Sequence, residues 1–331
     1  MKIAVLGDGA WGSALANLLD ANGHDVRLWG PFPDYVDEMR RTRLNPRFLP
    51  HLHFSERLVF LADLREAVEQ AELIVLALPT KYARPLFEKL RGVVPSGAIL
   101  VNIAKGLEEG TLKRVGELVA ELVGETRYAS LSGPSHAEEV ATGTPTAVVA
   151  ASLDKKTGTV VQQAFMNKYF RVYYCDDIVG VELGGAFKNV YAIAAGIIDG
   201  MGLGDNPKAA LVARSLAELT RLGRALGGKA ETFAGLSGLG DLIVTCYSRH
   251  SRNRSVGEQL GKGKSLEEIL QGMGMVVAEG IVTVKSAHAL SLREKIEAPI
   301  VHELYAALYS SKPPRECIRQ LMERAAKPEV Y

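Results

Sequence analysis

The chain has 331 residues, of which 47% are hydrophobic and 23% are charged. This composition is typical of a folded protein with about two domains, and it excludes a disordered chain. The 39 basic and 38 acidic residues leave a net charge of +1, which gives no support to a broad surface for nucleic acid or anionic lipid.

The first segment predicts a strand, a glycine-rich turn and a helix, in that order. Residues 2–6 form a short apolar run, the sequence GDGAWG follows, and apolar residues then recur at helical spacing. In such a turn the glycines allow a tight bend and a close approach to a pyrophosphate, and the helix N-terminus supplies N–H groups. Gly7, Gly9 and Gly12 therefore predict a dinucleotide site, with a purely structural turn as the alternative.

Further along the chain, strand-like and helix-like segments alternate. Strands are predicted at residues 25–29, 58–61, 73–78, 98–102 and 128–131, and a helix at residues 112–123. This alternation predicts a Rossmann-like, doubly wound and mainly parallel sheet covered by helices.

The strand pattern stops after two more candidate strands, at residues 146–151 and 170–174. Beyond them the pattern is helical with glycine-rich breaks. We therefore predict an α/β fold with a dinucleotide-binding domain at residues 1–177 and an all-α domain for substrate binding and catalysis at residues 178–331.

A buried helix with a lysine in its middle is the first candidate for chemistry. Residues 177–201 are apolar nearly all round, which predicts a helix in the core, and Lys188 and Asn189 interrupt that pattern. Burial of an ammonium group is costly or lowers its pKa, and a lysine with a lowered pKa can act as a general base near neutral pH. The alternative is that the Lys188 side chain extends to the surface along its methylene groups.

A glycine-rich segment supplies a carboxylate that can pair with this lysine. Residues 235–241, GLSGLGD, lead into a predicted helix, on which Asp241 and Thr245 lie one turn apart. Asp241 can orient the buried lysine, or it can cap the helix, and the two roles are compatible.

The segment SRHSRNR, residues 248–254, carries three arginines among hydroxyl and amide groups. Guanidinium groups match the oxygens of a phosphate, so we predict a small phosphate site, with solvated surface charge as the alternative. Wide basic surface and stacking aromatic residues are lacking, which argues against nucleic acid.

Two more motifs follow predicted strands, at the sheet edge where open α/β sheets bind ligands. One is NIAKG, which contains Lys105. The other is SGPSHAEE, in which Ser135 and Glu138 have the spacing of a capping box at a helix start and the N–H groups there can face an anion. The seven histidines form no ligand set, so no metal is predicted.

Cysteine usage and apolar segments predict the compartment. Cys175, Cys246 and Cys317 are far apart and include no C-x-x-C pair, which favours free thiols in a reducing compartment. No run approaches the roughly 20 apolar residues of a membrane span, and the N-terminal apolar run is too short for a secretion signal. We therefore expect a cytoplasmic protein.

Together the motifs GDGAWG, NIAKG, SGPSHAEE, ELGGAFKNV, GLGDLIVTCYS and SRNR resemble those of the NAD(P)-dependent glycerol-3-phosphate dehydrogenases of the bacterial type, and the resemblance covers essentially the whole chain. It implies reversible NAD(P)H-dependent reduction of dihydroxyacetone phosphate to sn-glycerol 3-phosphate, which supplies glycerophospholipid synthesis. It also implies that Lys188 exchanges the proton of the C2 hydroxyl. The sequence leaves the assembly open, a homodimer included.

The resemblance assigns site residues one by one. It implies a catalytic set of Lys188, Asp241 and Lys105. The implied substrate residues are Lys105, Gly133, Ser135, Lys188, Asp241, Ser251, Arg252 and Asn253. The implied cofactor residues are Gly7, Gly9, Ala10, Trp11, Gly12, Lys105, Ala137, Arg252, Val277 and Glu279.

Two departures from the family pattern leave the choice between NAD and NADP open. Asp8 stands in the turn where many relatives carry a small neutral residue, so its carboxylate must point away from the pyrophosphate or weaken binding. Gly30 and Pro31 follow the second predicted strand, where relatives carry a basic residue. An acidic residue that could bind the ribose is also absent there, although Asp34 lies close by in the sequence. Arg40 or Arg41 is a candidate to replace the missing basic residue.

Two other functions fit the same sequence. One is a related two-domain dehydrogenase for a hydroxy acid, because an arginine also binds carboxylates. The other is a non-catalytic dinucleotide sensor, which would not need a lysine in an apolar helix.

Overall fold

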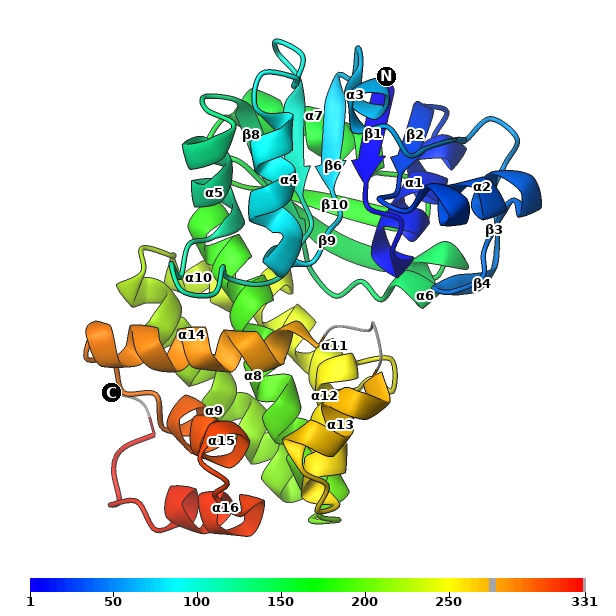
Figure 1. The fold of residues 1–331 in the computed structure, drawn as a ribbon. Helices are drawn as coiled ribbons and strands as arrows, with labels where there is room; N and C mark the ends of the chain where they lie inside the picture. The colour runs from blue at the N-terminus through cyan, green and yellow to red at the C-terminus, as the bar shows by residue number, and fades with distance from the viewer. Residues whose placement is uncertain (274–277, 330–331) are drawn as a thin grey trace.

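The structure, a computed structural model, describes residues 1–273 and 278–329. Figure 1 shows two parts: a sheet flanked by helices, which contains the N-terminus, and a bundle of helices below it. The last strand of the sheet ends at Cys175, and the long first helix of the bundle begins at Ile178.

In the described residues, eight strands form one sheet in the order β10-β9-β8-β7-β6-β1-β2-β5. Neighbouring strands are parallel except β8 and β9, which are antiparallel. The predicted mainly parallel, Rossmann-like sheet is therefore confirmed. The strands are β1 (Lys2–Leu6), β2 (Asp25–Trp29), β5 (Val59–Leu61), β6 (Leu73–Leu76), β7 (Ile99–Asn102), β8 (Arg127–Ser132), β9 (Thr146–Ala151) and β10 (Phe170–Cys175).

Both faces of the sheet are covered, as a doubly wound fold requires. Because side chains alternate along a strand, Ile3 and Val5 enter one hydrophobic core while Ala4 and Leu6 enter the other. The first core contains α1 (Ala10–Ala21), α2 (Pro33–Thr42), α6 (Ala137–Ala141) and α7 (Lys155–Phe165), and the second contains α3 (Leu64–Val68), α4 (Ala83–Leu90) and α5 (Val115–Leu122). A 3₁₀ turn, η1 (Thr80–Tyr82), precedes α4.

Two local features differ from the sequence prediction. The predicted helix at residues 112–123 is shorter, because Leu112 has a φ of 63°, a left-handed conformation that an α-helix does not contain. An antiparallel ribbon of β3 (Leu44–Asn45) and β4 (Leu49–His53) was not predicted. Pro50 lies inside β4, and a proline within a short run argues against a strand in sequence analysis.

The helical part is built around α8 (Ile178–Gly200), as Figure 1 shows. This helix is long and apolar enough to cross a membrane, but its whole apolar window is buried in the structure, as is usual for a core helix. Around it lie α9 (Asp205–Ala225), α10 (Ala230–Phe233), the π-helical turn η2 (Leu236–Gly240), α11 (Asp241–Tyr247), α12 (Arg252–Gly261), α13 (Leu266–Met273), α14 (Glu279–Arg293), α15 (Pro299–Tyr309) and α16 (Pro314–Met322).

A buried carboxylate near the start of α8 connects the two parts. Glu182 accepts hydrogen bonds from the Tyr128 hydroxyl at 2.5 Å, the Arg114 guanidinium at 2.8 Å and the Gly116 N–H at 3.1 Å. These donors lie on β8 or near the start of α5, so α8 is fixed against the sheet part at its N-terminal end.

Candidate active site

The turn between β1 and α1 has the geometry that a dinucleotide requires. Gly7 has a φ of +130°, which favours glycine, and a Cβ on Gly12 would collide with the Gly7 carbonyl. The α1 helix begins at Ala10 with no side-chain cap, so the free N–H groups of its first turn remain for a ligand. The open space beside Gly9, where a Cβ would contact nothing within 4 Å, leaves the backbone accessible. This turn therefore fits a pyrophosphate.

A second element of the dinucleotide site comes from the helical part. The Glu279 carboxylate, at the start of α14, accepts hydrogen bonds from the Thr80 N–H at 3.0 Å and the Thr80 hydroxyl at 3.2 Å. This contact brings α14 to the C-terminal edge of the sheet, since Thr80 follows β6. Val277, the neighbouring cofactor residue implied by the resemblance, lies outside the described residues.

Lys188 lies in the middle of α8 and is only 6% exposed, so the extended surface conformation considered from sequence is wrong. Its ammonium group contacts Asp241 Oδ1 at 2.8 Å and donates a hydrogen bond to Thr245 Oγ1 at 2.7 Å. Both partners come from α11. The sequence indicated the one-turn spacing and the pairing of Asp241 with the lysine, but not the contact of Thr245 with it. The buried ammonium group therefore has a carboxylate and a hydroxyl as partners.

A second lysine reaches the same carboxylate from the sheet part. Lys105 Nζ contacts Asp241 Oδ2 at 2.6 Å and donates to the Gly133 carbonyl at 2.9 Å. Asp241 is 1% exposed and directly follows η2. Its carboxylate bridges two ammonium groups that come from different parts of the fold. The capping role considered for Asp241 is not observed: Gly240 is the N-cap residue, and it makes no side-chain cap.

These contacts set the protonation behaviour of the cluster. Burial lowers the pKa of Lys188 to about 8, although the Asp241 carboxylate opposes the shift. Burial alone would raise the pKa of Asp241, but the Lys105 and Lys188 charges hold it below its ordinary value. At neutral pH the carboxylate is therefore ionised, while Lys188 can exchange its proton close to physiological pH.

Two asparagines connect this cluster to α12 and α14. Asn189 donates to the Lys105 carbonyl at 3.1 Å and accepts from Asn253 Nδ2 at 2.9 Å. Asn253 Oδ1 in turn accepts from the Gly280 N–H at 3.0 Å. This chain fixes Asn253 and the start of α12 beside the lysine cluster.

The arginine segment at the start of α12 divides into two kinds of side chain. Ser251 caps α12 by accepting from the Arg254 N–H at 3.2 Å. The exposed guanidinium of Arg252 makes no hydrogen bond or ion pair with the residues that the structure describes, although its charge acts on Glu279. Arg252 is therefore available to an anion at this point.

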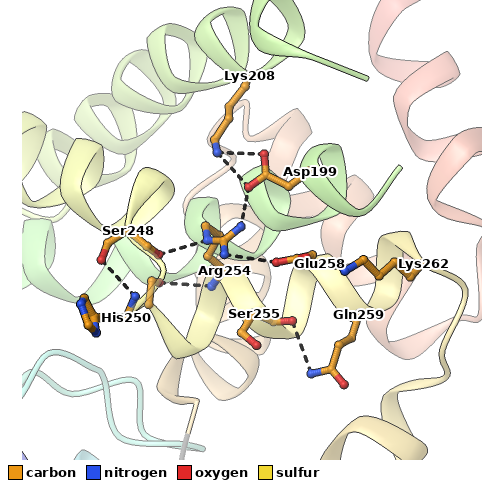
Figure 2. A network of polar contacts seen from close by, with 10 residues as sticks. Asp199, Lys208, Ser248, His250, Arg254, Ser255, Glu258, Gln259 and Lys262 are labelled. Carbon is orange, nitrogen blue, oxygen red and sulfur yellow. Dashed lines mark hydrogen bonds and ion pairs between the residues drawn. The ribbon is translucent and has the colours of Figure 1, made fainter. Parts of the chain in front are cut away.

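Arg254 does not belong to the predicted phosphate cluster. Figure 2 shows its guanidinium turned toward α8 and the C-terminal side of α12, where it contacts Asp199 at 2.6 Å, Glu258 at 3.1 Å and the Ser248 carbonyl at 3.0 Å. Asp199 also pairs with the buried Lys208 at 2.8 Å. Arg254 therefore anchors α12 on α8, so this arginine of the segment predicted to bind a phosphate is engaged elsewhere.

The SGPSHAEE segment lies at the end of β8, but it does not form the predicted capping box. Ser135 Oγ donates to the Gly133 carbonyl at 2.9 Å, and the N-cap of α6 is His136, without a side-chain cap. Ala137 is the first residue of α6. Because Gly133 also accepts from Lys105, this segment is held at the lysine cluster rather than at the helix start.

Sequence reasoning missed several residues around the cluster. Asn189 was noted only as the neighbour of Lys188, and Thr80 was not noted although it lies just after β6, at the ligand-binding edge of the sheet. His136 Nε2 and Ser132 Oγ are buried near the cluster and have no hydrogen-bond partner among the described residues. Their position after or at the end of β8 is the only sequence feature that points to them.

Comparisons with known proteins agree with this geometry. Family models described as the N-terminus and the C-terminus of NAD-dependent glycerol-3-phosphate dehydrogenase match residues 2–158 and 177–319. A protein named glycerol-3-phosphate dehydrogenase, with NAD(P)+ in its name, from Moorella thermoacetica is 50% identical over 329 residues, which cover 99% of this chain and 98% of the relative. A protein of the same name from Bacillus mycoides is 48% identical over 332 residues, which cover 99% of this chain and 97% of that relative.

A solved structure gives the same result. The crystal structure of glycerol-3-phosphate dehydrogenase from Coxiella burnetii matches with a TM-score of 0.93 and 39% identity, covering 98% of this chain and 99% of that chain. From the glycine-rich turn, the shared fold and these matches over nearly the full length, we conclude that this chain belongs to the NAD-dependent glycerol-3-phosphate dehydrogenase family.

Proposed function

We propose that this protein catalyses the reversible reduction of dihydroxyacetone phosphate to sn-glycerol 3-phosphate with NADH or NADPH. The observation that carries this proposal is the pairing of buried Lys188 with Asp241, a carboxylate that also contacts Lys105 of the sheet part. Relatives named for this activity, similar over almost the whole chain, support it.

Lys188 is the proposed acid and base. When bound, the reduced nicotinamide supplies the hydride that the C2 carbonyl carbon accepts. As negative charge develops on the C2 oxygen, the Lys188 ammonium group donates its proton there, and in the reverse direction the neutral amine accepts the hydroxyl proton. Asp241 and the Thr245 hydroxyl hold the Lys188 side chain in position by their contacts at 2.8 and 2.7 Å.

Lys105 is the second proposed catalytic cation. Its ammonium group lies 2.6 Å from Asp241, the carboxylate that also holds Lys188. In the proposed mechanism Lys105 adds positive charge near the reacting oxygen and does not release a proton. The two lysines and one carboxylate leave a net positive charge at the cluster, which favours an anionic substrate.

The substrate phosphate is proposed to lie at the start of α12. Arg252 has an exposed guanidinium there, and the N-terminal end of α12 adds N–H groups beside Ser251 and Asn253. On the sheet side, Gly133 and Ser135 border the same space through their contacts with each other and with Lys105.

The proposed cofactor residues divide between the two parts. The N–H groups at Ala10, Trp11 and Gly12 are proposed to hold the pyrophosphate, and Ala137, Lys105, Arg252 and Glu279 to border the nicotinamide half. Val277, which the resemblance also implies, lies outside the described residues. Thr80 fixes the Glu279 carboxylate at the sheet edge, which supports its assignment.

A substrate panel tests the proposal. Purified protein is mixed with NADH or NADPH and either dihydroxyacetone phosphate or several 2-oxo acids, and cofactor oxidation is followed by absorbance. Oxidation with the phosphate ester alone supports the proposal. Turnover with a 2-oxo acid instead, or no turnover at all, would contradict it and favour a hydroxy-acid enzyme or a sensor.

The remaining parts of the proposal concern the setting of this activity. We place the enzyme in the cytoplasm, where its three thiols stay free, and in the supply of glycerol 3-phosphate for phospholipid synthesis. We further propose residues 1–177 and 178–331 as the two domains. Two cores lie within the sheet part and a third lies almost entirely within the helical part, which supports this division. A homodimer is the proposed assembly, which light scattering in solution tests.

A further inference from the structure

Asp8 lies between the first two glycines of the dinucleotide turn, and its side chain faces the end of β2. A Cβ on Gly30, the first residue after β2, would collide with Asp8 Oδ2. The Gly7 N–H donates to the Trp29 carbonyl at 2.9 Å, which fixes the turn beside this strand. The Asp8 carboxylate is therefore located where β1 and β2 end side by side.

One oxygen of this carboxylate, Oδ2, lacks a hydrogen-bond donor among the described residues. Asp8 is 8% exposed, and its buried Oδ2 accepts no hydrogen bond from the residues that the structure describes. Burial raises the pKa of the Asp8 carboxyl, and the Asp8 backbone N–H and the charge of Arg47 only partly oppose this shift. A buried carboxylate oxygen without a donor is unfavourable, so this oxygen points to a ligand that supplies the donor.

The surrounding residues hold Asp8 in place. The Asp8 carbonyl accepts hydrogen bonds from Asn45 Nδ2 at 2.7 Å and from Ser13 Oγ at 3.2 Å. Asn45 is fully buried, and its Oδ1 accepts from the Tyr35 hydroxyl at 2.5 Å. The backbone at Asp8 is therefore fixed before any ligand binds, which reduces the cost of ordering it on binding.

The end of β2 is where Rossmann folds bind the adenosine ribose, and an acidic residue there accepts from the ribose 2′-hydroxyl. In this chain Gly30 and Pro31 occupy that position and offer no carboxylate. Asp34, the acidic residue that follows, lies exposed in the first turn of α2. Asp8 is thus the buried carboxylate at the place where a ribose hydroxyl needs an acceptor.

We propose that Asp8 accepts hydrogen bonds from the adenosine ribose hydroxyls and thereby makes this enzyme prefer NAD(H) to NADP(H). A 2′-phosphate in the same place would bring like charges together, and it would offer no hydroxyl donor to Oδ2. The inference rests on the proposed dinucleotide-dependent function, and it assigns the choice of cofactor to the turn itself rather than to the strand end.

The basic residues nearby compensate for the Asp8 charge only in part. Arg40 pairs with Asp37 at 2.5 Å and donates to the Phe60 carbonyl at 2.9 Å. Arg47 is exposed, and its guanidinium stacks on the Tyr35 ring at 4.0 Å. When the Asp8 charge is removed, Arg47 remains as a cation that can attract a 2′-phosphate.

Binding measurements test the proposal without turnover. Dissociation constants for NADH, NADPH, adenosine 5′-monophosphate and adenosine 2′,5′-bisphosphate are measured by calorimetry on the wild type, Asp8→Asn and Asp34→Asn. The wild type should bind NADH at least about tenfold more tightly than NADPH, since close like charges cost more than 1.4 kcal/mol, the energy of a tenfold change. Asp8→Asn should bring this ratio below about threefold, with weaker NADH binding and tighter NADPH binding, and the two adenosine fragments should show the same reversal.

The control and the contrary outcomes are distinct. Asp34→Asn removes a nearby exposed carboxylate and should leave the ratio unchanged; Asp8→Ala replaces Asp8→Asn if the latter does not fold. Equal wild-type affinity for NADH and NADPH, or a parallel loss of both in the Asp8 variants, would overturn the inference alone. No binding of either cofactor to the wild type would overturn the proposed function together with it.

Discussion

Lys105 and Lys188 come from different parts of the fold and contact the two oxygens of one buried carboxylate. The distances are 2.6 Å from Lys105 to Asp241 Oδ2 and 2.8 Å from Lys188 to Asp241 Oδ1. The Asp241 side chain therefore contributes both to the contact between the sheet part and the helical part and to the protonation behaviour of Lys188.

Replacing Asp241 by Asn should therefore reduce both stability and activity. Two buried ammonium groups would lose their carboxylate, and breaking a buried ion pair by removal of one partner costs about 3–5 kcal/mol. We expect a clearly lower free energy of unfolding in urea titrations and a lower kcat. Asp176→Asn, which removes an exposed pair with Lys229, is the matched control and should change the unfolding free energy little. Equal stability of the two variants would contradict the role of Asp241.

The pH dependence should have opposite signs in the two reaction directions. Reduction needs the Lys188 ammonium group, so its kcat/KM should be level at lower pH and fall as pH rises through about 8, the pKa that burial gives Lys188. Oxidation of glycerol 3-phosphate needs the neutral amine, so its kcat/KM should rise over the same range. Profiles with the same sign in both directions would show that another group carries the proton.

Arg252→Ala should mainly weaken binding of the phosphorylated substrate. Loss of a charge-assisted hydrogen bond costs about 1.5–3 kcal/mol, so KM for dihydroxyacetone phosphate should rise roughly tenfold or more. Turnover of an unphosphorylated analogue should be affected much less. Arg249→Ala, an exposed arginine of the same segment, is the control. A similar loss toward both substrates would argue against phosphate recognition by Arg252.

Arg254→Met should destabilise the protein through the contact between α12 and α8. The substitution removes the cation between Asp199 and Glu258, whose contacts Figure 2 shows, and it removes one donor from the Ser248 carbonyl, which keeps the Ser251 N–H at 3.2 Å. Thermal unfolding should start at a lower temperature than in the wild type. Lys262→Met removes an exposed partner of the same Glu258 and should have little effect. Matching melting temperatures for all three proteins would mean that Arg254 does not anchor α12.

Much of the fold was predictable because its patterns are local. The continuous apolar run of β1 and the apolar helical pattern of α8 are both visible in the sequence, so their bounds were predicted closely. Pro50 concealed β4, and the left-handed Leu112 shortened α5, because both depend on a local backbone conformation that apolar periodicity does not report.

The candidate site was predictable in its residues but not in its arrangement. Lys188 stood out because a lysine in an apolar helix is unusual, and Asp241 and Thr245 stood out by their one-turn spacing. That Lys105 shares the same carboxylate is a contact over 136 positions, which no local pattern contains. Arg254 and Arg252 look alike in the sequence. Arg254 contacts acidic residues whereas Arg252 is exposed, because residues two positions apart on a helix face different directions.

The central claim, that Lys188 is the acid and base for dihydroxyacetone phosphate, is tested most directly by Lys188→Met. NADH oxidation with saturating dihydroxyacetone phosphate is measured for this variant, for the wild type and for Lys208→Met, which removes a buried lysine outside the site. We predict a kcat lower by a factor on the order of 10² or more for Lys188→Met, with NADH affinity retained, and a much smaller loss for Lys208→Met. A folded Lys188→Met protein with a kcat close to that of the wild type would contradict the account.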